Sequence, residues 1–138
     1  MTGRPLHEVY RELVFDPLGM DGTWLEGHEL ARIPEVAHHY SDQLDWTTIS
    51  PTIDWAGGEL VTSAPDLARF VHGLWSERIV DACSLGELTR WTPGAWFPPG
   101  HAVRYERYGL GVGDNTVEGV KVLGHTGFVG AFAFHAPA

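Results

Sequence analysis

The stretch Val122-Leu-Gly-His-Thr-Gly-Phe-Val-Gly-Ala-Phe-Ala-Phe134 places a polar centre, His125-Thr126-Gly127, between two apolar runs. The pattern predicts a strand, a turn and a second strand, and its glycines allow another group to come close to the backbone. A His and a Thr at the end of a strand form a small hydrogen-bonding wall along which a polar substrate could lie. A tight hairpin with an incidental His and Thr explains the same residues, and the pattern alone leaves both interpretations open.

Three segments predict helices, over residues 5–14, 63–75 and 81–91. The first has a proline in its first turn and apolar residues along one face, and we expect it to stop at Pro17-Leu-Gly19. The second is the clearest, because Ser63 stands at the N-cap position and Asp66 complements the helix dipole.

Three strands are predicted over residues 105–113, 117–123 and 128–135, with Asp114 and Asn115 as a turn pair. Helices followed by an antiparallel meander indicate an α+β fold, in which a sheet of about three strands packs with helices. We expect one domain to span residues 1–138. Residues 32–55 lack periodicity and predict a long loop, which either walls a substrate cleft or is an ordinary surface excursion.

The charge balance excludes some classes of partner. Nine basic residues against eighteen acidic ones give a formal net charge of −9, which argues against a nucleic-acid partner. No polybasic cluster is present to attract anionic lipids, and no apolar run is long enough to cross a bilayer. The single cysteine, Cys83, excludes an internal disulfide and is expected to be a buried small hydrophobe in a helix.

Three segments resemble one enzyme superfamily, that of the serine β-lactamases and penicillin-binding proteins. Leu13-Val-Phe-Asp-Pro-Leu-Gly-Met-Asp-Gly-Thr-Trp24 and Gly57-Gly-Glu-Leu-Val-Thr-Ser-Ala-Pro-Asp-Leu-Ala-Arg-Phe70 are similar to two of its recurrent segments. Gly124-His-Thr-Gly-Phe-Val-Gly130 resembles its third motif, Lys/His-Thr/Ser-Gly, in the His form of DD-peptidases and related esterases. The resemblance covers nearly the whole chain. It implies a serine hydrolase that acts by acyl transfer on amide or ester bonds, with no cofactor and no metal.

The resemblance also implies roles for four residues. His125 would hydrogen-bond the carboxylate of the substrate or the Tyr of the second motif, and Thr126 would bind the same carboxylate through its hydroxyl group. Gly127 would keep the strand edge open for the substrate's backbone. The backbone N–H of Phe128 would supply one of two oxyanion-hole donors, and the loss of one such donor typically costs about 3 kcal/mol in the transition state.

Two motifs of the superfamily are absent from these 138 residues. The nucleophile belongs to a Ser-x-x-Lys motif, but the only lysine is Lys121, and Glu118 stands three residues before it. Tyr-x-Asn (or Ser-x-Asn) is excluded as well, because the only asparagine, Asn115, is preceded at that spacing by Gly113. We therefore expect the C-terminal portion of an incomplete β-lactamase/DD-peptidase-like domain, without its nucleophile region and last strands and helix. The chain would be inactive by itself, and the missing N-terminal part is its expected partner.

A histidine at position 125 changes charge near neutral pH, whereas a lysine would stay cationic. This difference favours a peptidase, amidase or esterase over a dedicated β-lactamase. The implied substrate is a small molecule or peptide, such as a D-alanyl peptide or a β-lactam. Two alternatives stand beside an enzyme: a non-catalytic binding domain that keeps the cleft wall, and a truncated reading frame without a function of its own.

Other candidate sites have simpler explanations. His7 and His28 each begin a pattern like the zinc-binding His-Glu-x-x-His, but both patterns end in arginine, so no metal site is predicted. A Ser63-His125-Asp66 triad lacks the Gly-x-Ser-x-Gly turn, and N-capping accounts for Ser63. The six tryptophans are spread among loops and helix ends, which is more typical of packing than of a carbohydrate platform.

Overall fold

The computed structural model describes residues 3–38, 40–41, 44–45, 47, 55–93, 104–127 and 130–137. The chain divides into two compact units, Met1–Phe70 and Val71–Ala138. The described helical segments are α1 (Leu6–Tyr10), the π-helical turn η1 (Arg11–Phe15), α2 (Asp16–Leu18), the 3-10 turn η3 (Trp55–Gly57), α3 (Ala64–Trp75) and α4 (Ala82–Leu88). In this part of the chain, no helix combines the length and apolar character that crossing a membrane requires.

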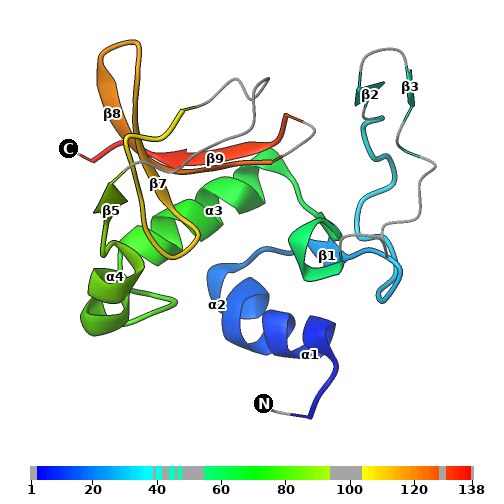
Figure 1. Ribbon diagram of the computed structural model, residues 1–138. Coiled ribbons are helices and arrows are strands. Elements are labelled where there is room, and N and C mark those ends of the chain that lie inside the picture. The colour runs from blue at the N-terminus through cyan, green and yellow to red at the C-terminus, as the bar shows by residue number, and fades with distance from the viewer. Residues whose placement is uncertain are drawn as a thin grey trace. The chain divides into compact units, whose positions relative to one another are not determined.

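The N-terminal helix runs through α1, η1 and α2 as one coil (Figure 1). The stop predicted at Pro17-Leu-Gly19 is confirmed, but the helix runs four residues past its predicted end at Val14, as far as Leu18. The helix ends at Gly19, which has a left-handed φ of 66°. Hydrogen bonds from Gly19 N–H to Asp16 O and from Met20 N–H to Phe15 O complete a Schellman motif there.

The first unit is built around the short antiparallel pair of β1 (Trp24–Leu25) and β4 (Leu60–Val61). This pairing sets Trp24 opposite Val61 and Leu25 opposite Leu60. It therefore joins the two segments, 13–24 and 57–70, that carry the family resemblance upstream of His125. The buried apolar side chains of the unit are Phe15, Leu18, Met20, Trp24 and Leu25.

A buried carboxylate, Asp66, holds the first turn of α3 to the loop before β1. Its Oδ2 accepts hydrogen bonds from Gly22 N–H and Thr23 Oγ1, both at 2.9 Å. Its Oδ1 accepts from Arg69, one turn along the helix, at 2.5 Å. Asp66 is 3% exposed, so these donors replace the water that the carboxylate has lost.

Arg11 and Glu29 tie the N-terminal helix to the segment after β1. Arg11 Nε donates to Glu29 Oε1 at 3.0 Å, and Arg11 Nη2 donates to the carbonyl oxygen of Thr23 at 2.7 Å. Leu25 N–H donates to the other oxygen of Glu29 at 2.9 Å. Burial raises the pKa of Glu29, but these hydrogen bonds and the charges of Arg11 and Arg32 outweigh it, so the pKa lies below its ordinary value of 4.5.

The segment predicted as a long loop, residues 32–55, contains a short hairpin. In its described part, β2 (Tyr40–Ser41) pairs antiparallel with β3 (Leu44–Asp45). His38 Nδ1 lies 3.0 Å from Asp45 Oδ2. Hydrogen bonds from Thr47 and His38 lower the pKa of the Asp45 carboxyl to about 2.

The second unit contains, among its described residues, one antiparallel sheet in the order β5-β6-β7-β8-β9. Its strands are β5 (Thr92–Pro93), β6 (Arg107–Tyr108), β7 (Gly113–Val117), β8 (Val120–Thr126) and β9 (Phe132–His135). The predicted α+β class is confirmed, but the sheet has five strands where about three were expected. The predicted strand 105–113 is interrupted after Tyr108, and the predicted strand 117–123 is displaced to Val120–Thr126. Figure 1 shows β7 and β8 as a long hairpin.

The turn of this hairpin is formed by Glu118 and Gly119, whose φ angles of 50° and 81° are those of a type I′ turn. The prediction of a turn at Asp114 and Asn115 is wrong, because both residues lie inside β7. Asp114 is 1% exposed, and its carboxylate accepts a hydrogen bond from Arg107 Nε at 2.7 Å on the neighbouring strand. Cross-strand ion pairing therefore outweighs the turn propensity of the Asp-Asn pair.

Helices α3 and α4 begin directly after the polar residues that cap their N-termini. Ser63 Oγ accepts from Asp66 N–H at 3.3 Å, which confirms the predicted cap of α3. Asp81 caps α4 by accepting from Ser84 N–H at 2.7 Å. Cys83 lies in α4 as expected, but the expectation that it is buried is wrong. The reason is that α4 buries none of its side chains.

Replacing Asp66 with Ala should lower the free energy of unfolding by about 2 to 4 kcal/mol, because Gly22 N–H and Thr23 Oγ1 lose a buried acceptor. Urea denaturation followed by tryptophan fluorescence measures the loss. The matched control is Asp81→Ala, which removes an exposed helix cap and should cost about 1 kcal/mol. Equal losses in the two variants would contradict the role given to Asp66.

Glu29 should make stability depend on pH. A carboxyl whose pKa is lowered by folding stabilises the folded chain above its unfolded pKa, and this contribution is lost as the pH falls through the folded value. The difference in unfolding free energy between the native chain and Glu29→Gln should therefore shrink from about pH 6 to about pH 3. Denaturation curves at several pH values measure it, and a constant difference would show that the hydrogen bonds and ion pairs of the Glu29 carboxylate contribute nothing.

Candidate functional site

The His125-Thr126-Gly127 motif lies at the end of β8, followed by a tight turn. His125 and Thr126 are the last two residues of the strand and pair with Ala133 and Phe132 of β9. Gly127 N–H donates to the carbonyl oxygen of Ala131 at 2.6 Å, which closes the turn between β8 and β9. His125 is exposed and Thr126 half-buried, so both reach the surface. Phe128, the expected oxyanion-hole donor, lies outside the described residues.

On the side that faces β7, the end of β8 is held by a side chain and not by a strand. Gly124 is the last residue of β8 that pairs with β7, so Thr126 extends beyond the end of that neighbour. The Thr126 N–H donates to Tyr105 Oη at 2.7 Å. Tyr105 Oη also lies 3.1 Å from Thr126 Oγ1, within hydrogen-bonding distance.

Two tyrosine rings contact the His125 imidazole and each other. The Tyr105 ring stacks on it with centroids 5.8 Å apart and an interplanar angle of 20°. The Tyr108 ring meets it edge-on, also at 5.8 Å. Burial, followed by the neighbouring Tyr105, raises the pKa of the Tyr108 phenol, so that side chain stays protonated at neutral pH. His125 is thus positioned by two rings while one side of it faces solvent.

Glycines make this packing possible at two positions. A Cβ on Gly113 would lie 2.0 Å from Cδ1 of Tyr105, so the ring crosses β7 only where no side chain is present. A Cβ on Gly124 would lie 1.9 Å from the carbonyl oxygen of Ala133, so the main chain of β9 approaches β8 closely there. These contacts bring Tyr105, His125 and Thr126 together.

The side chains at the end of β8 offer hydrogen-bonding groups. The imidazole of His125 and the hydroxyl of Thr126 can both hydrogen-bond an anionic or carbonyl oxygen. Neither residue is a nucleophile with an adjacent general base in the part of the chain that the structure describes. The predicted site residues His125, Thr126 and Gly127 therefore lie together at the surface end of β8.

Sequence reasoning missed Tyr105 and Tyr108 as parts of this site. Tyr105 is 21 residues from Thr126 in the sequence, and no local pattern marks the pair. The only available signal was Gly113, a glycine at a predicted strand end. A glycine at such a position indicates that another group lies close to the backbone, but it does not identify the residue.

The remaining candidates have structural roles. The Asp66 carboxylate accepts hydrogen bonds from Gly22, Thr23 and Arg69, and Ser63 caps α3. Neither side chain is therefore arranged as part of a catalytic triad. Among the described residues, no three His, Cys, Asp or Glu side chains are grouped so that they could hold a metal ion.

The two histidines of the zinc-like patterns do lie near each other. The rings of His7 and His28 stack with centroids 6.2 Å apart. His28 Nε2 lies 3.6 Å from Oε2 of Glu59, a residue that is 1% exposed. Glu59 Oε2 has no hydrogen-bond partner among the described residues, so His28 is the nearest compensating group that the structure shows.

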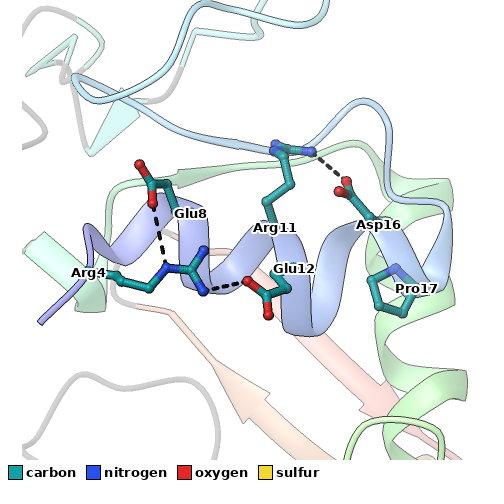
Figure 2. Close-up of a pocket in the computed structure, with 6 residues that line it drawn as sticks. All are labelled: Arg4, Glu8, Arg11, Glu12, Asp16 and Pro17. Carbon is teal, nitrogen blue, oxygen red and sulfur yellow. Dashed lines mark hydrogen bonds and ion pairs between the residues drawn. The ribbon is translucent and has the colours of Figure 1, made fainter. Parts of the chain in front are cut away.

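A surface depression of about 570 Å³ lies along the N-terminal helix, away from the motif in the sequence (Figure 2). Its lining is mostly charged and consists of Arg4, Glu8, Arg11, Glu12, Asp16 and Pro17. Arg4 pairs with Glu8 at 3.6 Å and with Glu12 at 2.5 Å, and Arg11 pairs with Asp16 at 3.4 Å. Both guanidinium groups are already neutralised, so the depression is a network of surface ion pairs and not a substrate pocket.

Comparison with solved structures finds amidohydrolases of the same fold. D-amino acid amidase from Ochrobactrum anthropi SV3, in complex with L-phenylalanine amide, is 29% identical with a TM-score of 0.79, and the match covers 94% of this chain and 38% of the amidase. D-stereospecific amidohydrolase from Streptomyces sp. is 26% identical with a TM-score of 0.76, over 98% of this chain and 41% of that protein. The octameric penicillin-binding protein homologue from Pyrococcus abyssi shares the fold at 23% identity, with a TM-score of 0.71 over 99% of this chain and 32% of the homologue.

This chain therefore spans about two fifths of the length of the two amidohydrolases. A comparison with curated proteins finds no match. The family model described as Beta-lactamase matches residues 1–138. The chain thus belongs to the Beta-lactamase family, within the superfamily of serine β-lactamases and DD-peptidases.

Proposed function

We propose that this chain forms the substrate-binding side of the acyl-transfer site of a serine hydrolase. The observation that carries the proposal is the position of His125 and Thr126, side by side at the exposed end of β8 and held there by Tyr105. Membership of the Beta-lactamase family supplies the reaction class, which is cleavage of an amide or ester bond through an acyl-enzyme.

Each residue of the motif then has a role. Thr126 Oγ1 donates to the carboxylate or carbonyl oxygen of the substrate, and His125 hydrogen-bonds the same group from the neighbouring position. Gly127 leaves the strand edge open, so that an extended substrate backbone can lie against it. The N–H of Phe128 donates to the oxyanion, a role that rests on the family resemblance because Phe128 lies outside the described residues.

The nucleophile must come from elsewhere. These 138 residues contain neither Ser-x-x-Lys nor Tyr-x-Asn. We propose that polypeptide beyond these residues, in the same protein or in a second chain, carries both motifs and completes one domain with residues 1–138. By itself the chain then binds substrate but does not turn it over, since one oxyanion-hole donor without an attacking serine stabilises little.

The solved relatives suggest the first substrates to test. Two of them are named as a D-amino acid amidase and a D-stereospecific amidohydrolase. We therefore propose amides and short peptides of D-amino acids as the substrate class, before simple esters and β-lactams.

The isolated chain should neither hydrolyse p-nitrophenyl esters nor react with a fluorophosphonate probe. A fusion of this chain to the N-terminal part of the Ochrobactrum anthropi amidase should do both and should hydrolyse D-phenylalanine amide. Product formation and mass spectrometry of the labelled protein measure these outcomes. Labelling of the isolated chain on a serine would overturn the assignment of the nucleophile to other polypeptide.

In the active fusion, Thr126→Val should lower kcat/KM for a D-alanyl-D-alanine peptide by roughly ten- to a hundredfold, because a hydrogen bond to a charged carboxylate is lost. D-phenylalanine amide, which lacks that carboxylate, should be affected less. His72→Ala serves as the matched control, since His72 is an exposed residue of α3. An equal effect of Thr126→Val on both substrates would rule out the proposed carboxylate contact.

A further inference from the structure

We infer that Tyr105 is the positioning residue of this site: its hydroxyl holds the end of β8 and orients the Thr126 hydroxyl so that its proton faces a bound carboxylate. The part that concerns the carboxylate rests on the function proposed above. The part that concerns Thr126 itself rests on geometry alone.

One of the two hydrogen bonds at Tyr105 Oη has a fixed direction. A backbone N–H can only donate, so in the 2.7 Å contact with Thr126 N–H the phenol oxygen accepts. Tyr105 Oη and Thr126 Oγ1 lie 3.1 Å apart and either oxygen can donate, and our inference assigns the donor role to the phenol. When Thr126 Oγ1 accepts from Tyr105, its own proton is left for an acceptor that the substrate brings.

The phenol is fixed well enough to set this direction. Tyr105 is 2% exposed, and its ring stacks on His125 and contacts the edge of Tyr108 with centroids 5.5 Å apart. The ring fills the place that a side chain on Gly113 would take. A hydroxyl on a ring held from several sides loses little further entropy on binding its partners, which is the condition for positioning.

Tyr105→Phe removes the oxygen and keeps the ring, and Tyr108→Phe is the matched control at the other tyrosine that contacts His125. Amide hydrogen exchange of the 138-residue chain, followed by NMR, should show Thr126 exchanging roughly three- to tenfold faster in Tyr105→Phe. Val122, earlier in the same strand, should exchange at the same rate in all three proteins, as should Thr126 in Tyr108→Phe. Unchanged exchange of Thr126 in Tyr105→Phe would overturn the inference.

The orientation of the hydroxyl is tested by titrating the same proteins with N-acetyl-D-alanyl-D-alanine and with its C-terminal amide. Tyr105→Phe should weaken binding of the carboxylate several-fold and leave binding of the amide unchanged, whereas a general loosening of the site would weaken both equally. Equal weakening would therefore overturn the orienting role. If the native chain binds neither ligand, the proposed carboxylate contact of Thr126 fails, and the exchange experiment still decides whether Tyr105 holds the strand.

Gly113→Ala gives a second, independent perturbation, because the new methyl group would displace the Tyr105 ring. It should accelerate exchange at Thr126 as Tyr105→Phe does, and in addition shift the ring signals of His125. A Gly113→Ala protein that is folded and has unchanged Thr126 exchange would contradict the inference.

Discussion

A buried polar group that lacks a hydrogen-bonding partner is costly, and this constraint organises both units of the chain. In the first unit the Asp66 carboxylate takes the N–H of Gly22 and the hydroxyl of Thr23, and so joins α3 to the loop before β1. In the second unit the Tyr105 hydroxyl takes the N–H of Thr126, where β8 extends beyond β7. In each case one side chain completes the hydrogen bonding of main chain that no regular element satisfies.

The same constraint explains why the candidate site is at the end of β8. A strand that extends beyond its neighbour has unpaired main-chain N–H and C=O groups. An extended substrate can hydrogen-bond to such groups. Tyr105 satisfies one of them and leaves His125 and Thr126 at the surface. In the proposed function, substrate recognition by this chain is thus separate from nucleophilic attack, for which these residues contain no Ser-x-x-Lys. Such a separation is chemically reasonable, because binding groups and the attacking group act on different sides of the scissile bond.

The elements that the sequence predicted well are those set by local chemistry. The helix at Ala64–Trp75 is confirmed because its cap, first-turn residues and apolar stripe all lie within it. The errors came from contacts between distant residues. Asp114 has the propensity of a turn residue, but its ion pair with Arg107 places it in a strand. Cys83 has the hydrophobicity of a core residue, but α4 buries none of its side chains.

For the site, the sequence by itself indicated the family, which the family model over residues 1–138 shows, and it singled out the contiguous residues His125-Thr126-Gly127 at the end of β8. It also determined that neither nucleophile motif is present in these residues. Only the tertiary structure decided how the motif is held. Tyr105, 21 residues away in the sequence, accepts the hydrogen bond of Thr126 N–H, and its ring fits against β7 because Gly113 has no side chain. The physical reason is that residue identity and spacing record local propensity, whereas a hydrogen bond across a sheet depends on where the fold brings two distant segments together.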